Sequence, residues 1–212
     1  MAGLAIQTFL TMLVILDPVG LAPIFAALSS GRPQAERRVI AGRAVTVAGA
    51  ILFAFAVGGA WLMQRLGISL AAFRVAGGLL LFRIALAMVF AQHERETKAE
   101  EAESRERHDI SVFPLAIPMI AGPGALASVM ILAAQAGGIS LRLAVVLGMT
   151  AVVLAICYVS LRMASRVAGL LGQTGVNVVT RVMGVLLTAL AVQYVADGVN
   201  SLLSLFRMTT TG

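Results

Sequence analysis

Charged side chains are scarce in this chain of 212 residues. Only 12% of its residues are charged, whereas 59% are hydrophobic. Soluble domains average about 25% charged and about 45–50% apolar residues. So few charges leave too little polar surface to cover a globule in water, and the apolar residues fall in blocks. The composition therefore predicts a protein whose solvent is the lipid bilayer.

Residues that carry redox, metal or catalytic chemistry are scarce too. The single cysteine, Cys157, excludes an intramolecular disulfide and a dithiol relay, and we interpret it as a small core residue. The two histidines, His93 and His108, stand far apart in one polar stretch, which is not a metal-ligand pattern. With no nucleotide loop or catalytic triad either, we expect no resident metal or organic cofactor and no enzymatic activity.

Long apolar runs are what the chain has in abundance. A membrane-spanning helix needs about 20 mostly apolar residues. Six runs reach that length, at approximately 4–28, 39–63, 69–91, 111–135, 141–162 and 176–206. We therefore expect an all-α membrane protein with six transmembrane helices in one membrane domain, residues 1–212.

The basic residues are placed for orientation rather than for binding nucleic acid. If alternate connections face opposite sides, one side holds Arg32, Arg37, Arg38, Arg43, Arg95, Lys98, Arg105, Arg107, Arg162, Arg166 and Arg181. The other side holds Arg65, Arg74, Arg142 and Arg207. Because basic residues in short loops stay in the cytoplasm, we expect both termini outside and the connection 92–109 inside. We interpret that connection as a solvated linker, with a docking segment as the alternative.

The two halves of the chain resemble each other. DPVG at 17–20 has an echo in AGPGA at 121–125, and RVAGGLLL at 74–81 has one in RVMGVLLT at 181–188. LGIS at 66–69 likewise matches LGQT at 171–174. Each half, about 1–91 and about 110–206, holds three spans, so the second half enters the membrane upside down. This predicts the inverted 3+3 repeats that recur in secondary transporters.

The paired motifs break two helices near the middle of the membrane. Pro18 and Pro123 lack the N–H that a continuous helix requires, and Gly20, Gly122 and Gly124 relax the backbone. Irregular backbone at this depth persists only against protein or a wet cavity. We therefore expect helices 1 and 4 to be broken around one shared substrate site. Its expected residues are Asp17, Pro18, Val19, Gly20, Ala121, Gly122, Pro123, Gly124 and Ser128.

Asp17 is the only ionisable side chain between Leu4 and Leu28. An aspartate at the centre of a membrane helix costs about 2.5–3.5 kcal/mol on insertion scales, so such residues usually handle substrate or ions. The alternative is that Asp17 only caps the second half of a kinked helix. The two roles are compatible.

Two further features bear on packing. Arg83, inside the third apolar run, is interpreted as snorkelling to the membrane surface, with a position facing Asp17 as the alternative. Thr46, Ala50, Ala54 and Gly58 recur every four residues, which predicts a ridge against which another helix packs closely.

Four stretches resemble one family of membrane proteins. They are DPVGLAPIF at 17–25, LGISLAAFRVAGGLLLF at 66–82, FPLAIPMIAGPGA at 113–125 and RVMGVLLTALAVQYVADGV at 181–199. Together they are similar to the MarC family of integral membrane proteins, over nearly the whole chain apart from the connection 92–109. The resemblance implies six membrane helices in the bacterial inner membrane with both termini outside, and a grouping with LysE-type exporters. It also implies a kinship with SnatA-type transporters of small neutral amino acids such as glycine and alanine.

The leading hypothesis is therefore a secondary transporter of small neutral amino acids, working by alternating access and coupled to protons or sodium ions. Its partners are the lipid bilayer and a small-molecule substrate. An exporter of another small metabolite is the first alternative, and a non-transporting membrane scaffold or regulator is the second.

Overall fold

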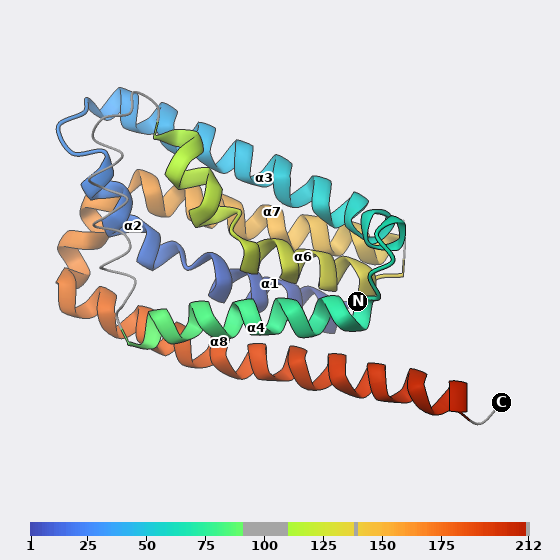
Figure 1. Cartoon of the computed structure of the whole chain (residues 1–212). Coiled ribbons are helices and arrows are strands. Elements are labelled where there is room, and N and C mark those ends of the chain that lie inside the picture. Colours follow the sequence, from blue (N-terminus) through green and yellow to red (C-terminus); the bar gives the residue numbers. More distant parts are fainter. Residues whose placement is uncertain (91–109, 138–139, 211–212) are drawn as a thin grey trace.

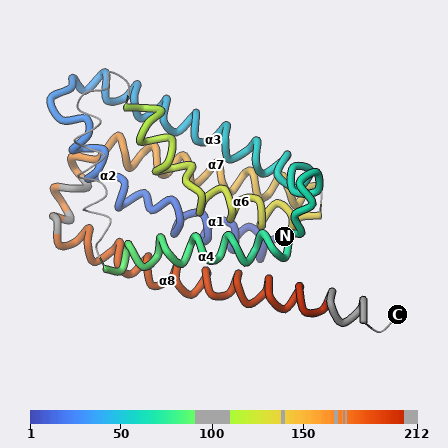
Figure 2. Tube along the Cα trace, viewed as in Figure 1, coloured from blue at the N-terminus to red at the C-terminus, as the bar shows by residue number. Residues whose placement is uncertain are grey.

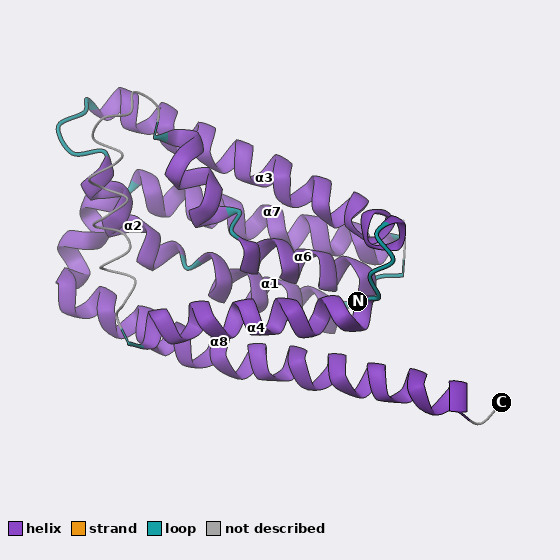
Figure 3. Ribbon diagram, in the orientation of Figure 1, coloured by secondary structure: helices purple, strands orange, loops and turns teal. Residues whose placement is uncertain are grey.

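In the computed structural model, which describes residues 1–90, 110–137 and 140–210, the chain is a bundle of helices (Figure 1). No strand occurs in these residues, which are helical apart from short connections (Figure 3). The helices are α1 (Ala2–Leu16), α2 (Pro18–Leu28), α3 (Gln34–Arg65), α4 (Leu70–Val89), α6 (Pro123–Gln135), α7 (Leu141–Arg162) and α8 (Ala164–Thr210). The segment η1 (Ser111–Ile120) precedes α6 and contains two residues with non-helical backbone angles, Phe113 and Ile117.

The described helices include five segments that are long and apolar enough to cross a membrane, and a sixth if the bent pair of η1 and α6 counts as one span. The first span, Ala2–Leu28, joins α1 and α2, and the last, Thr174–Ser204, lies within α8. η1 and α6 meet at an angle of 55°. The all-helical prediction and its apolar runs are confirmed, and the predicted linker at 92–109 lies outside the described residues.

The side chains on the outside of the bundle are largely apolar. Leu79 is 58% exposed, Val185 58% and Val57 55%. A soluble protein rarely exposes so many large hydrophobic side chains on neighbouring helices. These side chains form the face that lipid would cover.

The two broken spans pack against helices from the opposite half of the chain. α1 and α2 contact α7, and α2 also contacts α8, whereas η1 and α6 contact α3 and α6 also contacts α4. α4 and α8 form the most extensive helix pair, with α4 lying beside the part of α8 that follows its bend at Gly172 (Figure 2). The pair is antiparallel, because Gly184 lies against Ala85 and Met88 while Gly198 lies against Ala71 and Val75.

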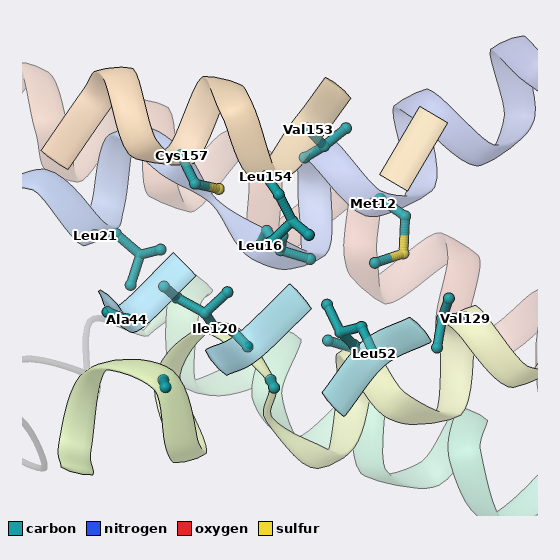
Figure 4. Close-up of a cluster of buried hydrophobic side chains, with 14 of the residues drawn as sticks. Met12, Leu16, Leu21, Ala44, Leu52, Ile120, Val129, Val153, Leu154 and Cys157 are labelled. Atoms are coloured by element: carbon teal, nitrogen blue, oxygen red, sulfur yellow. The ribbon is translucent and has the colours of Figure 1, made fainter. Parts of the chain in front are cut away.

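Two apolar clusters fill the interior. The larger one joins α1, α2, α3, α6 and α7, and it includes Met12, Leu16, Leu52 and Leu154 (Figure 4). The smaller one lies between α4, α6 and α8 and contains Leu81, Ile131 and Leu187. Val14 and Ile15 of α1 pack against the smaller cluster, so the first span touches both.

The predicted small-residue ridge does not pack within the chain. Thr46, Ala50 and Ala54 are exposed, and a Cβ added at Gly58 would meet nothing within 4 Å. The buried face of α3 instead carries Ala44, Ala48 and Leu52 among others. The prediction is wrong because α3 has small residues on several faces, and their spacing does not say which face meets a neighbour.

Candidate functional site

The first span breaks at Asp17. α1 ends at Leu16, α2 begins at Pro18, and Asp17 between them adopts a left-handed backbone conformation with φ 38° and ψ 68°. Few residues other than glycine adopt such angles, although aspartate is among those enriched there. Pro18 occupies the first position of α2, where its missing N–H is not needed. The break predicted at this dipeptide is confirmed.

The Asp17 side chain is half-buried and bonds in two directions. Its Oδ1 accepts a hydrogen bond from the Gly20 backbone N–H at 3.1 Å, which caps the start of α2. Its Oδ2 accepts one from the Thr180 hydroxyl of α8 at 3.3 Å. The capping role is therefore present, and Thr180 adds a contact from the other half of the chain that capping does not require.

Gly20 permits this arrangement by having no side chain. A Cβ at position 20 would lie 2.2 Å from Asp17 Oδ2 and 3.1 Å from the Thr180 hydroxyl oxygen. Any larger residue would displace the carboxylate. The glycine is thus required by a close approach rather than by backbone angles.

Helix α7 supports the same break from another side. The Ser160 hydroxyl donates a hydrogen bond to the Pro18 carbonyl at 2.5 Å. Cys157 lies one turn earlier on α7, is fully buried, and has a thiol near enough to Asp17 to interact electrostatically with it. Sequence reasoning missed Ser160 and Thr180. Their only signal is a hydroxyl within an apolar run, which many helices carry without a partner elsewhere.

The second span breaks between Ile120 and Pro123. Gly122, with φ −76° and ψ 170°, is extended and precedes α6, and Pro123 is the first residue of that helix. A Cβ at Gly122 would lie 2.4 Å from the Pro118 carbonyl oxygen, so only glycine fits. The irregularity extends further than predicted, because η1 also contains Pro114 and Pro118.

The other residues of the second break differ in their surroundings. Ala121 is buried in the larger apolar cluster, whereas Pro123 is exposed. Gly124 faces α4, where a Cβ would lie 2.9 Å from a methyl carbon of Leu81 and 3.0 Å from one of Ile84. Gly124 is thus a packing residue between α6 and α4.

The two breaks face one another across apolar side chains. Leu16 and Leu21 from the first break lie in one cluster with Ile120 from the second (Figure 4). Asp17 is directed toward Thr180 of α8. Val19, beside it in α2, is half-buried. The polar part of the first break therefore points to α7 and α8, while its apolar part meets the second break.

Ser128 belongs to a different polar group. It is fully buried in α6, and its hydroxyl lies near that of Tyr194 in α8. Thr11 of α1 and Arg74 of α4 are close to the same tyrosine. Arg83, the other basic residue of α4, is exposed. The described residues contain no group of three or more His, Cys, Asp or Glu side chains that could hold a metal ion.

Comparisons with known proteins agree on one family. A family model described as MarC family integral membrane protein matches residues 3–203. A UPF0056 membrane protein of Methanocaldococcus jannaschii is 39% identical, covering 93% of this chain and 97% of the relative. YvbG of Bacillus subtilis is 37% identical over 95% of this chain and 97% of its own length. YhcE of Escherichia coli is 33% identical over 92% and 91%.

These relatives are named only as UPF0056 membrane proteins, and they come from bacteria and an archaeon. No solved structure matches the chain significantly. The family match covers both broken spans and all the residues of the candidate site. This chain therefore belongs to the MarC family of integral membrane proteins.

Proposed function

We propose that the protein is a secondary transporter of small neutral amino acids such as glycine and alanine. The observation that carries the proposal is Asp17, a carboxylate at a helix break in the middle of a membrane span, held between the Gly20 N–H and the Thr180 hydroxyl. Acids inside membrane spans mark substrate or ion pathways far more often than they serve packing alone. The proposal makes the chain a carrier rather than an enzyme.

The packing of the helices supports alternating access between two inverted repeats. The first broken span packs on α7 and α8, which are the second and third spans of the second half. The second broken span packs on α3 and α4, which are the second and third spans of the first half. Each broken span thus packs on the second and third spans of the opposite half, which is the arrangement that a two-fold axis in the membrane plane produces. An inverted pair of this kind has two related packings, one open to each side.

The chemistry of the breaks supports a small zwitterion as substrate. α2 and α6 begin at the breaks and direct backbone N–H groups and partial positive charge there, which suits a carboxylate. At the first break, Asp17 and the carbonyl of Leu16 suit an ammonium group. The small size of the substrate is what the family resemblance implies.

Asp17 is also the group that we propose for coupling to protons or sodium ions. A carboxylate in a membrane is either neutralised by a proton or paired with a cation. Binding or release of the substrate changes whether Asp17 carries the proton or pairs with the cation. The distribution of basic residues supports an orientation with both termini outside, and the location proposed is the bacterial inner membrane that the family resemblance implies.

Uptake into liposomes tests the proposal. Purified protein is reconstituted into proteoliposomes and supplied with radiolabelled glycine or alanine under an imposed pH or sodium gradient. We expect accumulation or exchange above empty liposomes, and dependence on one of the two gradients. Counts that stay at the level of empty liposomes across a panel of neutral amino acids would rule the proposal out. Uptake of a different small metabolite would favour the exporter alternative.

A further inference from the structure

A second polar group lies inside the bundle, apart from Asp17. Among the residues that the structure describes, four buried side-chain atoms have no hydrogen-bond partner: Thr8 Oγ1, Arg74 Nε, Ser128 Oγ and the Tyr194 hydroxyl oxygen. Thr8 and Ser128 are fully buried, and Tyr194 is 3% exposed. In a membrane each such group costs several kcal/mol if it stays unsatisfied. Arg74, Ser128 and Tyr194 lie close together, so one polar occupant among them would satisfy all three.

The four groups come from four helices: Thr8 lies in α1, Arg74 in α4, Ser128 in α6 and Tyr194 in α8. α1 and α4 each contact both α6 and α8. Thr11 lies one turn after Thr8 in α1. The Tyr194 hydroxyl lies next to the side chains of Ser128 and Thr11, and Arg74 and Asp197 are the charged groups that act on it.

Glycines bring these helices close enough for the side chains to converge. A Cβ at Gly78 of α4 would lie 2.7 Å from Val195 of α8, which is next to Tyr194. A Cβ at Gly77 would lie 2.9 Å from the Cβ of Ala127 of α6, which is next to Ser128. α4 therefore touches α8 and α6 just where each carries its polar residue.

The donors in this group select an anion. A guanidinium can only donate hydrogen bonds and is always charged, and the hydroxyls of Ser, Thr and Tyr can donate as well. The nearest acid is Asp197, whose Oδ1 already accepts a hydrogen bond from the Gln193 amide at 2.7 Å. Arginine with hydroxyl donors is the usual set for a carboxylate. We propose that Arg74, Ser128, Tyr194 and the two threonines form a binding site for the carboxylate of a small solute.

This carboxylate site is separate from the Asp17 break. Thr11 and Asp17 are six residues apart on the first span, about 9 Å at the helical rise. Val14 and Ile15 lie between them on α1, and Leu187 lies between Thr180 and Tyr194 on α8; all three belong to or pack on the smaller apolar cluster. An apolar layer thus divides two polar sites. Carboxylate binding at this site does not depend on the proposed function. The further step, that a transported amino acid binds here before it crosses the apolar layer, rests on the proposed function.

Calorimetric titration of the full chain in detergent micelles tests the site. The probes are acetate, glycine and glycinamide, which has the amine of glycine but no carboxylate. We expect acetate and glycine to bind and glycinamide not to bind. Tyr194→Phe and Ser128→Ala should each weaken acetate binding about tenfold, and Arg74→Gln by more, because each removes a hydrogen bond to a charged group.

Matched variants control for general damage. Tyr158→Phe changes the other tyrosine of the chain, and Ser201→Ala removes a hydroxyl that bonds only the Asp197 carbonyl in its own helix. Both should bind acetate like the original protein. Size-exclusion profiles and melting temperatures establish that each variant is folded.

The outcomes separate this inference from the proposed function. Acetate binding that weakens in Tyr194→Phe supports the site even where liposomes take up no amino acid. Absence of binding by any carboxylate overturns it. Binding that is the same in Tyr194→Phe, Ser128→Ala and Arg74→Gln as in the controls overturns it too, even where glycine is transported.

Discussion

The breaks in the two spans differ in what stabilises them. At the first, Asp17 accepts from the Gly20 N–H, the Ser160 hydroxyl of α7 donates to the Pro18 carbonyl, and the Thr180 hydroxyl of α8 donates to the Asp17 carboxylate. At the second, Gly122 sits against the Pro118 carbonyl and Gly124 against α4, with no charged residue between 110 and 135. The same architectural feature is therefore stabilised by polar contacts in one half and by apolar packing in the other. Substitutions at the first break should alter transport, and those at the second should alter stability.

The largest effect is expected from Asp17→Asn. The amide oxygen can still accept from the Gly20 N–H, and the amide NH2 can donate to the Thr180 hydroxyl oxygen, so the fold should persist while the charge is lost. Glycine uptake into liposomes should fall about 100-fold, the upper range for losing a hydrogen bond to a charged group. Glu36→Gln is the control, because Glu36 is an exposed acid paired only with Arg32. If Asp17→Asn took up glycine at the original rate, Asp17 would serve only to cap α2.

Gly122→Ala tests the second break. The new Cβ would meet a backbone oxygen at 2.4 Å, which cannot rotate away, so the backbone must shift. We expect a loss of about 1–3 kcal/mol, seen as a lower melting temperature in detergent. In the control Gly148→Ala, the added Cβ meets nothing within 4 Å on α7. That change should stabilise the helix by about 0.5–1 kcal/mol, and equal melting of the two variants would contradict the comparison.

Gly20→Ala makes the same chemical change at the first break with a different expected result. The atom 2.2 Å from the new Cβ is Asp17 Oδ2, the end of a side chain that can turn aside. Stability should fall by about 1 kcal/mol, the value of a lost cap, while glycine uptake falls about tenfold because the carboxylate is displaced. If Gly20→Ala melted at as low a temperature as Gly122→Ala while the folded protein took up glycine at the normal rate, the first break would serve stability rather than transport. That result would contradict the comparison of the two breaks.

The smallest effect is expected from Ser160→Ala. It removes one hydrogen bond to the Pro18 carbonyl and should lower the free energy of unfolding by about 1 kcal/mol. Ser201→Ala, which removes a hydroxyl bonded within its own helix, should change it by less. Chemical denaturation in micelles measures both. Equal losses of stability in the two variants would show that the hydrogen bond from Ser160 of α7 does not stabilise the break.

The spans and their breaks could be predicted from local features. Run length alone predicts helices over 4–28 and 141–162, because a membrane demands continuous backbone hydrogen bonding over its thickness. The Asp17–Pro18 and Gly122–Pro123 dipeptides predict where that bonding fails. Pro114 and Pro118 carried the same kind of signal and indicate, in hindsight, the irregular η1.

Contacts across the sequence could not be predicted in this way. Nothing in the sequence distinguishes Thr180 and Ser160 from other hydroxyl residues. The packing of α8 brings Thr180 to Asp17, and the packing of α7 brings Ser160 to the Pro18 carbonyl. Ser128 was expected beside the breaks, and the structure instead groups it with Tyr194 and Arg74. The ridge from Thr46 to Gly58 fails for a related reason. In an apolar helix both the buried and the lipid-facing sides are hydrophobic, so periodicity does not distinguish them.

The sequence by itself therefore determined the solvent, the number of long apolar runs and the positions of the two breaks, since all three depend on residue types within one segment. The tertiary structure decided which side chains surround each break and which buried hydroxyls lie close together. The physical reason is that backbone hydrogen bonds in a membrane are satisfied within a span, whereas a charge or hydroxyl inside it needs a partner from another helix. That partner is chosen by packing, in which close approaches at glycines such as Gly20 and Gly78 set the distance between helices.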